Sequence, residues 1–164
     1  MSFRFIHSSD LHLGRRFGNI PEPPDGNLRG RLMEARFDKI RRLAQAARDH
    51  GAGHVLLAGD TFDSATPSRQ VLRQALAAMG EAEAVQWWLL PGNHDNLRNA
   101  EQVWDEIGRD APPNVHAMRS ADPVSLTAGV TLLPCPVPVR ATGRDLTEAL
   151  PRIATPEGTL RVGL

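Results

Sequence analysis

The chain has 164 residues, of which 41% are hydrophobic and 23% are charged, and its formal net charge at pH 7 is zero. This length and composition predict one soluble globular domain with its own core and exclude a disordered chain. No run of about 18 apolar residues occurs and the N-terminus leads directly into a predicted strand, so we expect no membrane span, no secretory signal and a cytoplasmic location.

Helices and strands alternate through the first two thirds of the chain. Residues 3–8 alternate as in a short strand, and glycines and prolines make 14–27 a loop. The apolar residues of 28–50 then recur at helical spacing, with Asn27 as the predicted cap and Gly51 as the predicted stop.

Two further units of strand and helix follow. The apolar run at 54–58 does not alternate, which predicts a fully buried strand, and 84–90 predicts the next. The helices predicted at 66–80 and 99–108 each open on a capping residue. This order predicts an α/β domain with a central, largely parallel sheet flanked by helices.

The segments shorten beyond residue 110. Strands are predicted at 115–118, 123–126 and 130–133, a helix at 143–150 and a last strand at 159–164. We find no internal repeat and no interdomain linker, so residues 1–164 are expected to belong to a single domain.

Charge is unevenly distributed along the sequence. Residues 1–50 hold ten Arg or Lys against six Asp or Glu, whereas residues 51–110 hold four against nine. A basic first third beside an acidic middle suits a phosphate-bearing polymer, although zero net charge lacks the signature of a strongly basic nucleic-acid binder. An equally good interpretation is that the arginines of the first third form the solvated face of a helix.

Three of the predicted strands end in polar side chains that can bind metals. These are Asp10 and His12 after the first strand, Asp60 and Asp63 after the second, and Asn93, His94 and Asp95 after the third. Because open α/β sheets bind ligands outside the carboxyl ends of their strands, we expect these groups to converge.

Oxygen and imidazole ligands favour manganese, iron or zinc, and a carboxylate such as Asp60 can bridge two ions that share an activated water. Cys135 is the single cysteine, so one chain cannot form a disulfide or a thiolate metal site; we interpret it as a small buried residue rather than a reactive thiol. The alternative for the whole set is that the polar residues serve only as caps and turns.

Three motifs together resemble the calcineurin-like metallophosphoesterases. Asp10-Leu11-His12, Gly59-Asp60-Thr61-Phe62-Asp63 and Gly92-Asn93-His94-Asp95 match the first three signatures of that family in order and spacing. Residues 9–14 and 59–63 are most similar to its DNA repair exonucleases, the nuclease subunits of the SbcCD type. The resemblance implies a layered metallophosphoesterase fold and a dinuclear-metal phosphodiesterase acting on DNA ends, with two divalent ions, manganese first and iron or zinc as alternatives.

The resemblance also implies a role for each metal ligand. Asp10 and His12 would bind one ion, and Asp60 would bridge both. Asn93 would bind the second ion through its amide oxygen.

The catalytic roles follow from the same resemblance. His94 would face the scissile phosphate as a general acid or as a stabiliser of charge. Asp63 would hold the His94 imidazole in place and favour its protonated, charged form. For Asp95 a role in shaping the loop is favoured over a catalytic one.

One departure from the family pattern concerns its remaining histidine ligands, one after a later strand and a pair in a Gly-His-x-His signature. Neither is present in this sequence. We therefore expect the chain to be the N-terminal part of a nuclease domain, without the capping region and the segment that docks an ATPase.

The partners that the resemblance implies for the full-length protein are DNA, a second copy and an ATPase subunit, with no membrane. Two alternatives remain open. One is a phosphatase or cyclic-nucleotide phosphodiesterase of the same family. The other is a noncatalytic fragment or scaffold that binds metal weakly.

Overall fold

The structure is a computed structural model that describes residues 2–24 and 26–164, so Met1 and Asp25, the latter within the loop predicted at 14–27, lie outside the described residues. In chain order the elements are β1 (Phe5–Ser8), α1 (Leu28–Asp49), β2 (His54–Leu57), α2 (Arg69–Gly80), β3 (Gln86–Leu89), α3 (Glu101–Asp110), β4 (Val115–Ala117), β5 (Val124–Thr127), β6 (Val130–Leu133), a 3-10 turn (Leu150–Arg152) and β7 (Leu160–Gly163). The predicted alternation of strands and helices is confirmed.

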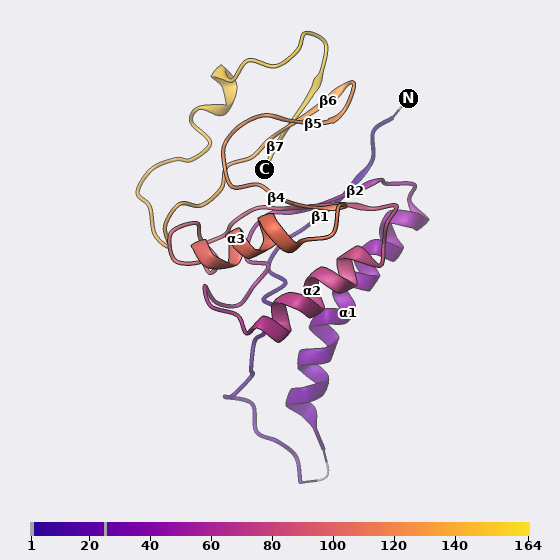
Figure 1. Cartoon of the computed structure of the whole chain (residues 1–164), viewed down its shortest axis with the longest axis vertical. Helices are drawn as coiled ribbons and strands as arrows, with labels where there is room; N and C mark the ends of the chain where they lie inside the picture. The colour runs from indigo at the N-terminus through magenta and orange to yellow at the C-terminus, as the bar shows by residue number, and fades with distance from the viewer. Residues whose placement is uncertain (1, 25) are drawn as a thin grey trace.

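Within residues 2–24 and 26–164, two sheets and three helices are present, and Figure 1 shows that they pack in layers. Strands β1 to β4 make a parallel sheet in sequence order, and a second sheet has the order β5-β6-β7, with β5 antiparallel to β6. The three helices pack on one face of the parallel sheet, and the second sheet packs on the other. This is the predicted α/β fold with a central parallel sheet.

Strand β2 shows why its sequence does not alternate. Val55 and Leu57 lie in the core beneath the helices, whereas Leu56 lies in the core against the second sheet, and all three are 0% exposed. A strand covered on both faces needs apolar residues at every position. The prediction of a fully buried strand is therefore confirmed for Val55, Leu56 and Leu57, while His54 and Ala58 at the two ends are half-buried.

Helix α1 begins and ends where its caps predict. The Asn27 side chain accepts a hydrogen bond from the Gly30 amide at 3.0 Å, and Gly51 follows the helix with a φ of 60°. Its buried stripe of Ile40, Ala44 and Ala47 faces the sheet. Among residues 2–24 and 26–164, no helix is both long enough and apolar enough to cross a bilayer.

The starts of the other two helices differ from prediction. Helix α2 is capped by Ser68, whose hydroxyl accepts from the Val71 amide at 3.3 Å, and not by Thr66. Helix α3 follows Ala100, which has no capping group, and continues through Gly108 to Asp110. Burial of its apolar stripe offsets the roughly 1 kcal/mol by which glycine disfavours a helix interior.

The last third of the chain departs most from prediction. The helix predicted at 143–150 is absent, and only the turn at Leu150–Arg152 is helical. Its residues are mostly exposed, and the Asp145 carboxylate accepts from the Thr147 amide at 2.8 Å, a local bond that competes with helix formation. Cys135, predicted to be buried, is half-buried, and burial raises the pKa of its thiol.

Candidate metal centre

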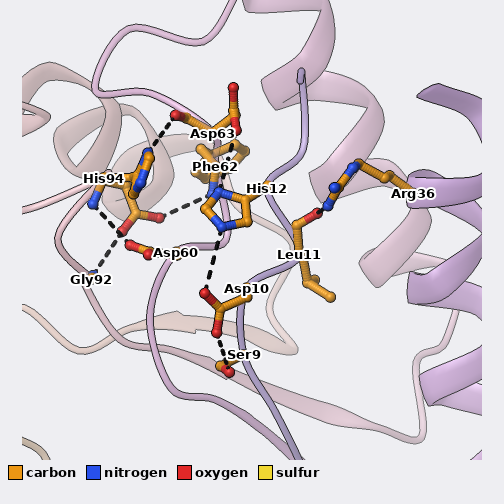
Figure 2. Close-up of polar contacts among 11 residues, drawn as sticks. Ser9, Asp10, Leu11, His12, Arg36, Asp60, Phe62, Asp63, Gly92 and His94 are labelled. Atoms are coloured by element: carbon orange, nitrogen blue, oxygen red, sulfur yellow. Dashed lines mark hydrogen bonds and ion pairs between the residues drawn. The ribbon is translucent and has the colours of Figure 1, made fainter. Parts of the chain in front are cut away.

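The loops after β1, β2 and β3 meet at the carboxyl ends of the parallel strands. Figure 2 shows side chains from all three loops in one place. The Asp10 amide donates to the carbonyl of Gly59 at 3.2 Å, and the His12 amide donates to the carbonyl of Asp60 at 3.0 Å. The third loop joins them because the His94 amide donates to the Asp60 carboxylate at 2.8 Å. Folding thus brings polar groups from three distant segments into one site.

The backbone at this site adopts an unusual conformation. Asp10, His12 and Asp60 have φ values of 56°, 46° and 53°, and Phe17 is the fourth described non-glycine residue with a positive φ. Such left-handed residues cost about 1–3 kcal/mol each and persist only where the surroundings fix them. Three of the four carry side chains that the sequence predicts to be metal ligands.

Glycines allow the second and third loops to approach this closely. A Cβ on Gly92 would lie 2.3 Å from both the backbone nitrogen and the Oδ1 atom of Asp60. A Cβ on Gly59, whose φ is 93°, would lie 2.9 Å from the Cα of Gly92. The two glycines therefore set the position of the Asp60 carboxylate against the third loop.

His12, Asp60 and His94 form a cluster of metal-competent groups. Each offers one ligand atom, and these atoms all lie within 4.8 Å of one another. Asp60 is buried, with 7% of its surface exposed, and the two histidines are half-buried. Two imidazoles and a carboxylate are suitable ligands for manganese, iron or zinc.

Carboxylates flank both ring nitrogens of His12. Oδ1 of Asp10 lies 3.5 Å from His12 Nε2, and Oδ1 of Asp63 lies 3.3 Å from His12 Nδ1. Two atoms that are each about 2.1 Å from one ion lie at most about 4 Å apart, so the spacing of Asp10 and His12 fits a shared metal. The Asp10 and His12 pair therefore fits one divalent ion on geometry, and the wider cluster of His12, Asp60 and His94 fits on the chemistry of its donor atoms.

The orientation of His94 is fixed by Asp63. His94 Nδ1 lies 2.9 Å from the backbone carbonyl of Asp63. Because a carbonyl oxygen only accepts hydrogen bonds, Nδ1 carries a proton and Nε2 is the nitrogen left to act on a ligand. The sequence predicts that Asp63 holds this imidazole, and the contact runs through its main chain, while its carboxylate contacts His12 instead.

Asp95 ties the second and third loops together beneath the site. It is 0% exposed, and its two carboxylate oxygens accept from the Gly92 amide at 2.7 Å and the Phe62 amide at 3.0 Å. Its carbonyl accepts from the Trp104 indole of α3 at 2.6 Å. Burial raises the pKa of Asp95, while the hydrogen bonds from backbone amides oppose that shift. These contacts match the loop-shaping role favoured from the sequence.

Two contributors to the site were not singled out from the sequence. Asn96 is buried, and its side chain donates to the carbonyl of Asn93 and accepts from the amide of Asn99, both at 3.1 Å. Asn93, a predicted metal ligand, is itself exposed. Arg36 donates to the carbonyl of Leu11 at 2.7 Å from helix α1. The sequence could have indicated Asn96, since it directly follows the third motif. Arg36 could not be found in this way, because a helix arginine 25 positions from its partner gives no local signal.

A parallel sheet with imidazoles and carboxylates gathered at its strand ends suits metal-dependent hydrolysis. The calcineurin-like phosphoesterase family matches residues 3–139, and the chain belongs to that family. Members of the family are typically metal-dependent, in agreement with the His12, Asp60 and His94 cluster.

A curated relative gives the same assignment. The chain is 34% identical over 125 residues to the uncharacterized metallophosphoesterase YhaO of Bacillus subtilis (strain 168). The match covers 73% of this chain and 28% of that protein, so the chain spans well under half the length of its relative. The family predicted from the three motifs is confirmed, whereas the DNA repair branch and the individual ligand roles stay predictions.

Proposed function

We propose that the protein is a metal-dependent phosphodiesterase of the DNA repair exonuclease type that acts on DNA ends. Its cofactor would be a pair of divalent ions, with manganese as the favoured metal. The observation that carries this proposal is the convergence of His12, Asp60 and His94, with Asp10 beside them. Association with a second copy and an ATPase subunit in the cytoplasm belongs to the same proposal and rests on the sequence resemblance.

The chemistry follows from the side chains. Asp10 and His12 would hold one ion, Asp60 would lie between two, and Asn93 would hold the second. Bound divalent ions supply an activated water and neutralise charge on the phosphate. His94, with Nδ1–H donated to the carbonyl of Asp63, presents Nε2 to donate a proton to the leaving oxygen or to stabilise its charge.

The division of roles between His94 and Asp60 is testable. We expect His94→Ala to keep most manganese affinity and to lose about 10²-fold or more in turnover, as for removal of a general acid. Asp60→Ala is expected to lose both, because a bridging carboxylate is removed. Manganese titration and hydrolysis rates measure the two properties separately, and a fully active His94→Ala would contradict the assignment.

A basic notch beside the site supports a polymeric substrate. It has a volume of about 300 Å³ and lies between the end of β1 and helix α1, lined by Ser8, Ser9, Leu11, Lys39, Arg42 and Leu43. Ser9 adjoins Asp10, so two cationic side chains lie next to the loop that carries the first predicted ligand. Cations at this position suit a phosphate neighbouring the scissile one, which a nucleic acid has and a small monoester lacks.

The substrate proposal is tested by comparing linear duplex DNA with a nitrophenyl phosphate ester. The double variant Lys39→Gln/Arg42→Gln should raise KM for DNA and lower its salt dependence, with ester hydrolysis unchanged. The control Arg48→Gln/Arg73→Gln removes the same charge from exposed positions outside the notch. Activity on the ester alone would remove the nuclease proposal in favour of a phosphatase, and weak manganese binding with no hydrolysis would favour a noncatalytic scaffold.

A further inference from the structure

Arg36 connects helix α1 to the loop that carries Asp10 and His12. Its Nη1 donates to the carbonyl oxygen of Leu11 at 2.7 Å, and Leu11 is the residue between those two predicted ligands. Figure 2 shows the guanidinium reaching this carbonyl directly. A single long-range bond from α1 therefore fixes the peptide between two left-handed residues.

The loop is held differently on its two sides. On the β2 side, backbone bonds from the amides of Asp10, His12 and Leu13 hold it to residues 59–61. On the α1 side, Arg36 makes the only side-chain hydrogen bond to the backbone of residues 9–13 within the described part of the chain. Since left-handed Asp10 and His12 need their surroundings to fix them, loss of this bond would release one side of the turn.

Arg36 is itself held firmly in place. Its guanidinium lies 5.1 Å from the ring centre of Phe17, and the Arg15 guanidinium lies 5.8 Å from the same ring. Burial lowers the pKa of Arg36, Arg15 adds to that effect, and the Asp63 carboxylate opposes it. Its Nε atom is buried without a hydrogen-bond partner among the described residues. The bond to the Leu11 carbonyl is therefore the one hydrogen bond of this guanidinium among the described residues.

We propose that Arg36 is a positioning residue, which holds the Asp10–His12 turn in its left-handed conformation so that both side chains face one metal ion. The inference rests on the proposed function, because it takes Asp10 and His12 as ligands. Residues that orient metal ligands typically change metal affinity by about 10- to 100-fold when removed.

The same helix provides a matched control. Arg29 donates through Nε to the carbonyl of Ile20, also at 2.7 Å and also part-buried, but Ile20 does not adjoin a predicted ligand. The variants are Arg36→Gln, Arg36→Lys and Arg29→Gln. Each is assayed for manganese affinity by calorimetry, for urea stability, and for amide hydrogen exchange at residues 10–13.

We expect Arg36→Gln to weaken manganese binding about tenfold or more and to speed exchange at residues 10–13, whereas Arg29→Gln leaves both within about twofold of wild type. Arg36→Lys keeps the charge without the planar fork, so it should recover only part of the affinity, and it replaces Arg36→Gln if that variant fails to fold. Equal manganese affinity and exchange in all variants would overturn the inference, even if urea stability fell. If wild type itself binds no manganese, the proposed function fails, and the exchange rates alone decide whether Arg36 holds the turn.

Discussion

Gly92→Ala is the most direct perturbation of the contact between the second and third loops. The added Cβ would lie 2.3 Å from the backbone nitrogen and Oδ1 of Asp60, and real Cβ contacts essentially never fall below 3.0 Å. The loops must therefore separate by roughly 0.7 Å or more, since packed atoms do not overlap. Neither partner can yield easily, because one is main chain and the other accepts from the His94 amide.

The expected loss of unfolding free energy is about 1–3 kcal/mol, the usual range for overpacking a filled site. The same shift displaces the Asp60 carboxylate by roughly 0.7 Å. A misplacement of about 1 Å can lower turnover about 10²-fold. Urea unfolding measures the first quantity, and manganese calorimetry with a hydrolysis assay measures the second.

Gly53→Ala is the control, since no described heavy atom lies within 4 Å of its added Cβ, and Gly53 lies directly before β2, away from the third loop. It is expected to behave as wild type. A Gly92→Ala variant with unaltered stability and unaltered manganese affinity would refute the close approach on which the site geometry depends.

Asp95→Asn is expected to lower the unfolding free energy in urea by about 1–3 kcal/mol, because an amide has one acceptor oxygen for the two buried backbone amides that the carboxylate now satisfies. Burial is the main cause that lowers the pKa values of His54 and His116, so the folded state binds fewer protons than the unfolded state as the pH falls below the ordinary histidine value of 6.5. Their contribution to stability is complete above that value and is lost as the pH falls through the folded pKa, so stability should decrease on acidification. The double variant His54→Gln/His116→Phe should flatten this dependence and exposed His50→Gln should not; equal slopes in both would contradict the prediction.

The sheet and α1 were predictable because their patterns and their packing agree. The apolar run of β2 and the stripe of α1 are buried as expected, and Asn27 caps the helix. Predictions failed where a local signal competed with tertiary structure or with a second local signal. Gly108 did not end α3, because its neighbours are packed in the core, and residues 143–150 had no buried face to stabilise a helix.

At the candidate site, the sequence predicted which residue types gather but not how they are oriented. Asp10 and Asp60 are at strand ends as expected, yet nothing in the pattern indicates their left-handed backbone. The carboxylate of Asp63 turns to His12, while its carbonyl contacts His94, a choice that depends on the path of the chain. Such details follow from tertiary geometry and have no signature in residue spacing.

The anchors of the site are linked through the same few atoms. Asp60 Oδ1 accepts from the third loop, Asp95 fixes the amide of Gly92 that lies against Asp60, and Arg36 fixes the opposite side of the first loop. Because left-handed residues at the site are unfavourable alone, each loop keeps its conformation only while the others hold theirs. The predicted metal ligands, which come from three separate segments, are therefore positioned as one unit. This explains why supporting groups such as Asp95 and Arg36 belong to the site as much as the predicted ligands do.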